Sequence, residues 1–390
     1  MTMTMTMTVI NRDEFNPGIL SAPQIEAMVD QGVIRPAVPI ADGQIQPASI
    51  DLRLGARVWR IRASFLPGEG MSVNDKLTEM AMHEIDISHG AVLEKGCVYI
   101  AEVEESLKLP DDTSGFANPK SSTGRLDVFT RMISDGATEF ETARPGYEGK
   151  LYAEISPRTF SVLVRRGSRL SQLRFRKGQS RISDDEMKQL QNDVGLVHGG
   201  GLDGRDIRDG VPLSVDLSGA VYSAMPGLLG WRARKHAGVI DVDKPKAYPV
   251  APFWEKVTRR DLSAGGLILN PDEFYILVSR ECVTVPPDYA AEMTAYDTRV
   301  GEFRAHYAGF FDPGFGVASL GAGRTRAVLE VRSHDVPFLL EEGQTVCRLV
   351  YEPLSLVPPT LYGASGSGSH YQAQGLQLAK HFLPPETADE

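Results

Sequence analysis

Two adjacent serines stand between basic residues in the segment Pro119-Lys120-Ser121-Ser122-Thr123-Gly124-Arg125. Two hydroxyls, an ammonium and a guanidinium supply several hydrogen-bond donors and two positive charges, which is what a polyphosphate needs where no glycine-rich phosphate loop is present. The same composition is typical of an exposed polar turn, and composition alone favours the turn. The segment is therefore a candidate phosphate site with a structural alternative left open.

A glutamate lies inside an apolar strand-like run at two places, Glu154 in LYAEI and Glu330 in AVLEV. A strand glutamate usually faces solvent. In a desolvated pocket the pKa of the carboxyl group rises instead, and it can exchange protons near neutral pH. Both placements are open for each residue.

Two further segments carry polar side chains among turn-forming residues. Asp312 precedes Pro-Gly in Phe310–Gly316, where its carboxylate can accept from a sugar hydroxyl beside an apolar wall, although a plain β-turn explains the sequence equally well. The segment 361–375 is rich in Gly and Ser, and we expect it to be a flexible tail or lid. Its polar anchors can close over a ligand, with a functionless linker as the alternative. These anchors are Tyr362, His370, Tyr371 and Gln374.

The chain repeats itself at an offset of 176 residues. Tyr99 recurs as Tyr275, Glu154 as Glu330, and the string 164–175 as 340–351. One offset held across separate blocks predicts two tandem copies of one fold.

Composition excludes several functional classes. A length of 390 residues with a net charge of −10 argues against a general nucleic-acid or membrane-surface binder. The three cysteines form no CxxC pair, and with no apolar run of about 18 residues we expect a reduced, cytoplasmic protein without zinc. A zinc deaminase motif, a Walker loop and a hydrolase nucleophile elbow are all missing from the sequence.

Short alternating runs separated by turn residues predict a mainly β fold, a sandwich or distorted barrel, with a few short helices. One helix is expected at about 22–31, with Ser21 and Gln24 as a capping box and Gly32 as its stop. We divide the chain into a disordered N-terminus (1–17), a first copy ending in a linker (18–205) and a second copy with a C-terminal lid (206–390).

Five motifs in order resemble the dCTP deaminase branch of the dUTPase-like superfamily, most closely a long, duplicated form. The similarity covers most of both copies and implies two dUTPase-like barrel or jelly-roll domains. The motifs are QPASIDLRLG (46–55), GFANPKSSTGRL (115–126), HYAGFFDPGFG (306–316), AVLEV (327–331) and SHYQAQG (369–375).

The two copies depart from the family pattern in complementary ways. The first keeps the serine motif but has Arg144 where the sugar-binding Asp is expected. The second keeps Asp312 and the tail but has lost the serines. The resemblance therefore implies one composite site within the chain. A second, symmetric site at Glu154, the alternative catalytic residue, would lack serines, Asp and tail.

The resemblance also implies a reaction, the deamination of dCTP to dUTP and ammonia with no metal at the reacting carbon. Glu330 would shuttle protons, with Ser121, Arg125 and the backbone of Ala308 completing the catalytic group. Substrate would bind through Lys120, Ser122, His306, Tyr307, Phe311, Asp312, Tyr362, His370 and Gln374. Mg²⁺ would arrive bound to the triphosphate.

The sequence leaves alternatives open for the activity and for the oligomeric state. The alternatives to a dCTP deaminase are a dUTP diphosphatase, which hydrolyses dUTP to dUMP and diphosphate, a bifunctional deaminase-diphosphatase, and a non-catalytic deoxynucleotide-binding protein. The protein is expected to form a homodimer or homotrimer, or to remain a monomer. We also expect truncation after Leu361 to leave the fold intact, because both copies are complete by then.

Overall fold

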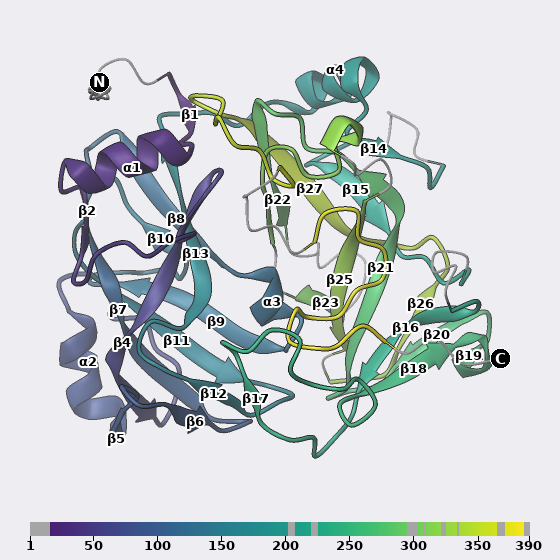
Figure 1. The fold of residues 1–390 in the computed structure, drawn as a ribbon, viewed down its shortest axis with the longest axis horizontal. Coiled ribbons are helices and arrows are strands. Elements are labelled where there is room, and N and C mark those ends of the chain that lie inside the picture. The colour runs from purple at the N-terminus through teal and green to yellow at the C-terminus, as the bar shows by residue number, and fades with distance from the viewer. Residues whose placement is uncertain are drawn as a thin grey trace, which may run out of the picture.

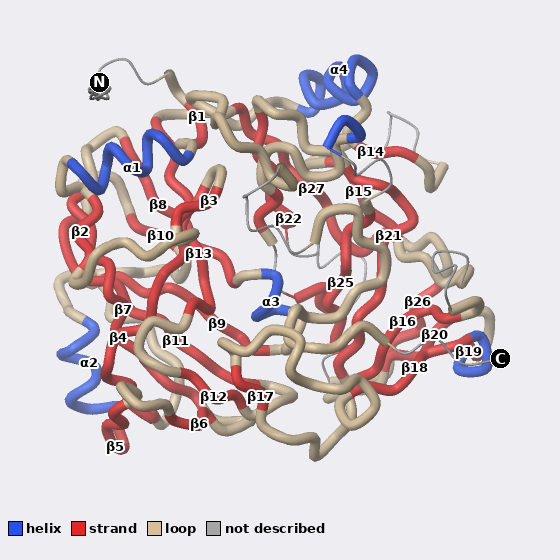
Figure 2. Tube along the Cα trace, in the orientation of Figure 1, coloured by secondary structure: helices blue, strands red, loops and turns tan. Residues whose placement is uncertain are grey.

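The protein consists of two β-rich halves lying side by side, seen in a computed structural model (Figure 1). The first half lies on the left in purple and blue, the second on the right in green and yellow. The structure describes residues 16–201, 207–219, 225–294, 303–306, 309–320, 325–333, 335–364 and 371–385. Figure 2 shows that strands dominate both halves and that the helices are few and peripheral, apart from α3 at the junction. The mainly β prediction is confirmed.

The first half is built on one large sheet of eleven strands, whose central order is β10-β8-β13-β4-β7-β11-β9. Its strands, together with β6 and β12 of a smaller sheet, are β1 (Gly18–Ile19), β2 (Ile34–Pro36), β3 (Ile45–Gln46), β4 (Ser49–Ile61), β5 (Ala81–Asp86), β6 (Ala91–Leu93), β7 (Val98–Lys108), β8 (Thr113–Pro119), β9 (Val128–Ser134), β10 (Thr142–Ala143), β11 (Glu148–Pro157), β12 (Val162–Val164) and β13 (Arg169–Lys177).

The second half divides its strands among a six-stranded sheet (β18-β16-β21-β25-β23 with β14), a four-stranded sheet (β15-β27-β22-β24) and a three-stranded sheet (β19-β20-β26), except for β17, which joins β12 and β6 of the first half. The strands are β14 (Val197–His198), β15 (Val211–Ser214), β16 (Leu228–Ala233), β17 (Ile240–Asp241), β18 (Trp254–Thr258), β19 (Leu262–Ser263), β20 (Gly266–Leu269), β21 (Phe274–Val283), β22 (Tyr289–Thr294), β23 (Phe303–His306), β24 (Phe310–Phe311), β25 (Arg326–Ser333), β26 (Phe338–Glu341) and β27 (Thr345–Pro353).

The helices are α1 (Ala22–Asp30), α2 (Val73–Met80), α3 (Ser121–Gly124) and α4 (Asp184–Val194), with 3-10 turns at Arg259–Asp261 and Ala318–Leu320. The predicted first helix is confirmed. The backbone N–H of Ser21 donates to Gln24 Oε1 at 3.0 Å, and Gly32 follows the helix with a φ of +69°. None of the helices among the described residues is long and apolar enough to span a membrane.

The pairing of β11 with β7 in the first half corresponds position for position to the pairing of β25 with β21 in the second. Glu154 on β11 lies opposite Ile100 on β7, and Glu330 on β25 lies opposite Ile276 on β21, with the same offset of 176 residues in both members of the pair. The repeat in the sequence is therefore a repeat in strand register, and the equivalent glutamates occupy equivalent places.

One apolar cluster extends across both halves, in addition to the clusters inside each half. A single cluster of buried side chains joins Phe160 and Val162 of the first half to Trp231 and Trp254 of the second, and the Phe160 and Trp254 rings meet edge to face at 5.5 Å. The short strand β12 pairs in parallel with β17 across the same junction. The junction is thus a continuous interior rather than a contact between two finished surfaces.

The segment after residue 371 belongs to this core. Leu376, Leu378, Ala379 and Phe382 are buried in the shared cluster. The expectation that truncation after Leu361 leaves the fold intact is therefore wrong, because removal of these side chains would open the junction to water. The Gly- and Ser-rich composition of 361–375 does not extend to the apolar residues that directly follow it. The expectation for residues 1–15 lies outside the described residues.

We predict that Phe382→Ala destabilises the whole chain. The Phe382 ring is 5% exposed and lies 5.5 Å from the Phe253 ring and 5.8 Å from the Trp254 ring. Truncation leaves a cavity, so the free energy of unfolding should fall by about 3–5 kcal/mol. Chemical denaturation measures this, with Leu383→Ala as the matched control, since Leu383 is 43% exposed. Equal losses in the two variants would contradict the packing role.

Candidate functional site

A cavity of about 670 Å³ opens between the two halves. The predicted residues that line it are Lys120, Ser121, Ser122 and Arg125 from the first half and Phe311, Asp312, Glu330, Tyr362 and Gln374 from the second. The fold thus brings together the motifs that each copy keeps, although more than 200 residues separate the serines from Glu330.

The serine motif forms one turn of helix directly after a strand. Pro119 ends β8, Lys120 remains extended, and the N–H groups of Thr123 and Gly124 donate to Lys120 O at 2.8 and 2.9 Å. This turn, α3, lies between the halves (Figure 1). Ser122 and Arg125 are only 6% and 3% exposed, so the alternative of an exposed polar turn is wrong.

Arg125 connects the motif to the second half. Its Nη1 donates to Gln377 O at 2.9 Å and its Nη2 to Gln374 Oε1 at 2.8 Å. The guanidinium carbon lies 3.9 Å from the centre of the Tyr371 ring, a cation–π arrangement. Its Nε lies 3.9 Å from Glu330 Oε1 and has no hydrogen-bond partner among the described residues. The guanidinium is therefore held in place by the tail and turns its remaining N–H group toward the glutamate.

Glu330 is buried on β25, and the solvent-facing alternative is wrong for it. Burial raises the pKa of Glu330 to about 8, the positive charge of Arg125 opposes that rise, and the negative charge of Asp127 adds to it. A carboxyl group whose pKa lies near the working pH can both give and accept a proton. This is the electrostatic setting that proton transfer at a bound substrate needs.

Glu154, the equivalent residue of the first half, is outside the cavity lining. Its Oε1 accepts from Arg131 Nη2 at 2.6 Å and from Arg131 Nε at 3.1 Å. Arg131 on β9 occupies the register position that His306 occupies on β23 in the second half. The two glutamates thus share a backbone position but face different partners.

Asp312 lies in a buried loop that the tail covers. Burial raises its pKa, and the guanidinium of Arg174, whose Nη2 donates to Asp312 Oδ1 at 3.2 Å, opposes this rise. Gly314 has a φ of +96°, and a Cβ there would come 2.8 Å from that of Leu361, so only glycine lets the tail pass. The N–H of Tyr362 then donates to Pro313 O at 2.8 Å.

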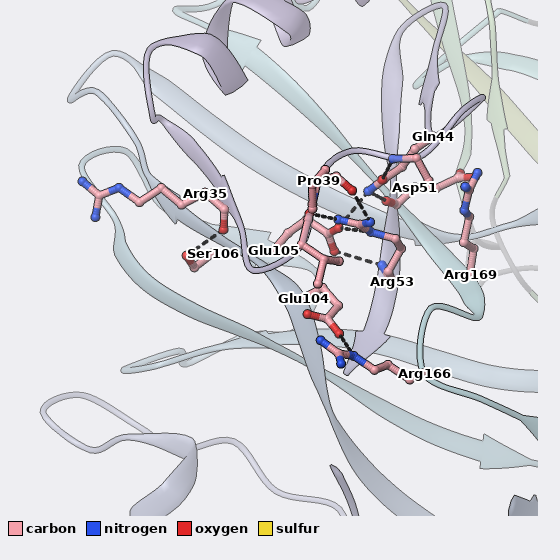
Figure 3. Close-up of polar contacts among 12 residues, drawn as sticks. Arg35, Pro39, Gln44, Asp51, Arg53, Glu104, Glu105, Ser106, Arg166 and Arg169 are labelled. Atoms are coloured by element: carbon pink, nitrogen blue, oxygen red, sulfur yellow. Dashed lines mark hydrogen bonds and ion pairs between the residues drawn. The ribbon is translucent and has the colours of Figure 1, made fainter. Parts of the chain in front are cut away.

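Basic side chains gather at another part of the cavity wall. Lys120 Nζ pairs with Asp51 Oδ2, and Arg169 Nη1 lies 3.6 Å from the same oxygen. Lys380 also lines the cavity. Figure 3 shows Asp51 beside Gln44 and Arg169. Gln44 Nε2 donates to the backbone oxygen of Asp51 at 2.9 Å. The position of Asp51, and through it that of Lys120, is therefore fixed from behind.

That support rests on a buried ion pair, also drawn in Figure 3. Gln44 Nε2 donates to Glu105 Oε1 at 2.7 Å, and Arg53 Nε donates to the same oxygen at 2.7 Å. Burial raises the pKa of Glu105, and its hydrogen bonds to Arg53 and Gln44 oppose the rise. Because a buried charge is stable only with its partners present, the network resists rearrangement.

Some predicted residues cannot be placed, and some lining residues were not predicted. Tyr307, Ala308 and His370 lie outside the described residues, and only the backbone of His306 is described. Asp51 stood in the motif QPASIDLRLG without a role of its own, and Tyr371 stood among the tail anchors. Arg169 and Lys380 carried no signal that reasoning from motifs would detect.

No group of three or more His, Cys, Asp or Glu side chains suited to a metal ion occurs within the described ranges. Acidic groups do line the cavity, but Asp51 is paired with Lys120 and Asp312 with Arg174.

The two halves match the two domains of one known family. Its description is 2′-deoxycytidine 5′-triphosphate deaminase, whose N-terminal domain matches residues 16–179 and whose C-terminal domain matches residues 183–382. A dCTP deaminase of Haloarcula marismortui is 32% identical over 162 residues, which are 40% of this chain and 79% of that protein. A dCTP deaminase, dUMP-forming, of Sulfurihydrogenibium sp. is 28% identical over 181 residues, 46% of this chain and 94% of that protein.

A solved structure matches nearly the whole chain. The crystal structure of 2′-deoxycytidine 5′-triphosphate deaminase from Agrobacterium tumefaciens is 52% identical and superposes with a TM-score of 0.81. The match covers 88% of this chain and 99% of that chain. The fold is therefore dUTPase-like.

The raised pKa of Glu330 predicts a dependence of stability on pH. The folded state keeps this proton up to about pH 8, whereas an unfolded glutamate loses it near its ordinary pKa of 4.5. Folding therefore binds a proton between these values, and stability is lost as the pH rises through that window. Glu330→Gln removes this loss. Its stability relative to the parent should increase from pH 5 to pH 8, by on the order of 3–5 kcal/mol.

Denaturation curves of both proteins at a series of pH values measure this difference. A difference that stays constant between pH 5 and pH 8 would show that Glu330 is already ionised at pH 5 in the folded state.

Proposed function

This chain belongs to the 2′-deoxycytidine 5′-triphosphate deaminase family, and we propose that the cavity between its halves converts dCTP and water to dUTP and ammonia. The chain is thus an enzyme, and the alternative of a non-catalytic nucleotide-binding protein falls away. The observation that carries the proposal is the meeting of Glu330 with Arg125 in a cavity that also holds both serines and Asp312.

Glu330 would move the protons of the reaction. Its protonated form gives a proton to N3 of cytosine as water adds to C4, and the resulting carboxylate takes a proton from that water. In a second cycle it carries a proton from the new hydroxyl to the amine, and the C4–N4 bond breaks as ammonia leaves. The pKa of about 8 supports both directions of transfer near neutral pH. No metal is assigned to the reacting carbon.

Ser121 and Arg125 would fix the reacting groups. Ser121 lines the cavity, and its hydroxyl is a donor and acceptor suited to the attacking water. The backbone of Ala308, which lies outside the described residues, would assist it. Arg125 would orient Glu330 and stabilise its charged form during each transfer. Because its other N–H groups are bound to the tail, the guanidinium is preorganised for this role.

The triphosphate would lie along the basic part of the wall, bound by Lys120, Ser122 and Tyr362, with Lys380 added from the structure. Gln374 is less free for this task than its sequence position implies. Its Oε1 accepts from Arg125 and its Nε2 donates to Arg326 O at 3.1 Å. We therefore assign Gln374 to bracing Arg125.

Mg²⁺ would be bound by the phosphate oxygens, because two acidic side chains of the cavity wall, Asp51 and Asp312, are already paired with basic partners. When bound, the ion neutralises part of the phosphate charge. The role of the chain's own residues is to hold the remaining charge through Lys120 and Lys380, which line the same cavity.

Asp312 would accept a hydrogen bond from the 3′-hydroxyl, and Phe311 or Tyr307 would exclude a 2′-hydroxyl. Phe311 is buried against Phe315 with ring centres 5.0 Å apart, so its position resists displacement by a larger sugar. His306 and His370 remain proposed substrate contacts.

We place the reaction in the supply of dUTP for dTTP synthesis in the cytoplasm. The matching strand register of the two halves supports their origin by internal duplication. A homodimer or homotrimer is compatible with a site that one chain completes.

Release of dUMP is the second candidate outcome, favoured by the relatives that are named dUMP-forming. Incubation with dCTP and Mg²⁺, followed by assay of ammonia, dUTP and dUMP, distinguishes the products.

We predict that Glu330→Gln lowers kcat by about 100-fold or more while dCTP binding is nearly unchanged, because the amide cannot carry protons. Glu154→Gln is the matched control, since Glu154 has the equivalent strand position but lies outside the cavity lining. It should keep turnover close to that of the parent. If Glu154→Gln loses activity and Glu330→Gln keeps it, the proposal has assigned catalysis to the wrong half.

We also predict that Ser121→Ala lowers kcat by about 10- to 1000-fold, the range for loss of one hydrogen-bond donor aimed at the reacting atoms. Thr123→Ser is a suitable control, because Thr123 lies in the same turn but is not among the cavity-lining residues. Steady-state assays of ammonia release measure both variants. Unchanged turnover in Ser121→Ala would remove the serine motif from the catalytic group.

A further inference from the structure

A buried arginine of the first half reaches the sugar-binding loop of the second. Arg174 lies on β13 with its side chain 2% exposed, and its Nη2 donates to Asp312 Oδ1 at 3.2 Å. Burial lowers the pKa of Arg174, while Asp312, Glu292 and Glu352 oppose that shift. An arginine is costly to bury, so its contacts must compensate for the lost water.

Those contacts fix the loop from behind. Nε donates to Ala48 O at 3.2 Å, Nη1 to Ala291 O at 3.1 Å, and Nη2 also to Phe311 O at 3.4 Å. The guanidinium carbon lies 4.0 Å from the centre of the Phe310 ring. Arg174 therefore links three backbone carbonyl groups to the carboxylate of Asp312, which lines the cavity.

The hydrogen bond leaves Asp312 with one oxygen for another partner. Oδ1 is bound to Arg174, and Oδ2 has no hydrogen-bond partner among the described residues. Arg174 itself is not part of the cavity lining. Its effect on a substrate must therefore pass through Asp312.

We propose that Arg174 is a positioning residue that holds Asp312 so that its second oxygen meets the 3′-hydroxyl of the substrate. Recognition of the deoxyribose then depends on a side chain from the opposite half of the chain. This inference rests on the proposed function, in which Asp312 binds that hydroxyl.

Arg176, two residues along the same strand, offers a matched control. It also joins the halves, since its Nε donates to Glu352 Oε2 at 2.7 Å. Within its own half, its guanidinium carbon lies 4.5 Å from the Phe116 ring centre. It contacts neither Asp312 nor the cavity. Loss of Arg176 thus reports on general damage to the junction.

The experiment compares kcat/KM for dCTP with that for 2′,3′-dideoxycytidine triphosphate in the full-length enzyme. In the parent enzyme the analogue should be worse by about 10- to 100-fold, the range for a hydrogen bond to a charged group. In Arg174→Met this ratio should fall below about 3-fold, through a higher KM for dCTP and with a smaller change in kcat. Arg174→Lys, which keeps the charge, should retain part of the ratio, and Arg176→Met should keep all of it.

Asp312→Asn completes the test, because the double variant Arg174→Met/Asp312→Asn should discriminate no less than Asp312→Asn alone if both residues act through one contact. A parent-like ratio in folded Arg174→Met, or an equal loss of the ratio in Arg176→Met, would overturn the proposal. If neither Arg174 variant folds, Phe310→Leu, which removes the stacking face, should lower the ratio, and a parent-like ratio there would count against it.

These outcomes are separate from those of the proposed function. A parent enzyme that does not deaminate dCTP contradicts the function itself. A parent enzyme that deaminates both triphosphates equally well retains the function but overturns the role of Asp312 and Arg174.

Discussion

The site depends on one interaction across the junction, in which the buried carboxyl group of Glu330 in the second half faces the guanidinium of Arg125 in the first half. Glu330 lies 3.9 Å from Arg125 Nε, and no other salt bridge to Glu330 occurs within the described residues. An ionised carboxylate without a nearby positive charge costs several kcal/mol in such a place. The glutamate can therefore ionise readily only when the halves are joined. The tail makes this possible by holding Arg125 through Gln374 and Gln377.

The contrast between the two glutamates shows how one strand position can serve two purposes. Glu154 receives its cation from the neighbouring strand, with Arg131 Nη2 at 2.6 Å. Its ion pair is completed inside the first half and leaves that oxygen occupied. Glu330 is opposite His306 in the strand register, and its cation approaches from across the junction at a longer distance. A carboxylate held more loosely beside an open cavity is better suited to exchanging protons with a bound molecule.

Much of this could be predicted from the sequence, and the failures have physical causes. The offset between Glu154 and Glu330 indicated the repeated strands, and the unequal motifs indicated a composite site. Arg174 belongs to a basic cluster that resembles a solvated strand face, because alternation along a strand shows two faces but not whether a second domain covers one of them. The tail was misjudged for a related reason. Its Gly and Ser content describes residues 361–375, whereas Leu378 and Phe382 decide whether the chain end is held.

Charged pairs also account for the precision with which the halves meet. Three arginines of the first half face carboxylates of the second half: Arg125, Arg174 and Arg176. In the opposite direction, Arg332 of the second half pairs with Asp127 of the first. The shared apolar core favours association but is tolerant of small displacements, since dispersion and hydrophobic contacts lack direction. Buried ion pairs do not tolerate such displacements, because a shift that breaks a pair leaves two buried charges whose desolvation is no longer compensated. The core therefore drives the halves together, and the ion pairs select the alignment in which Glu330 and Asp312 face one cavity.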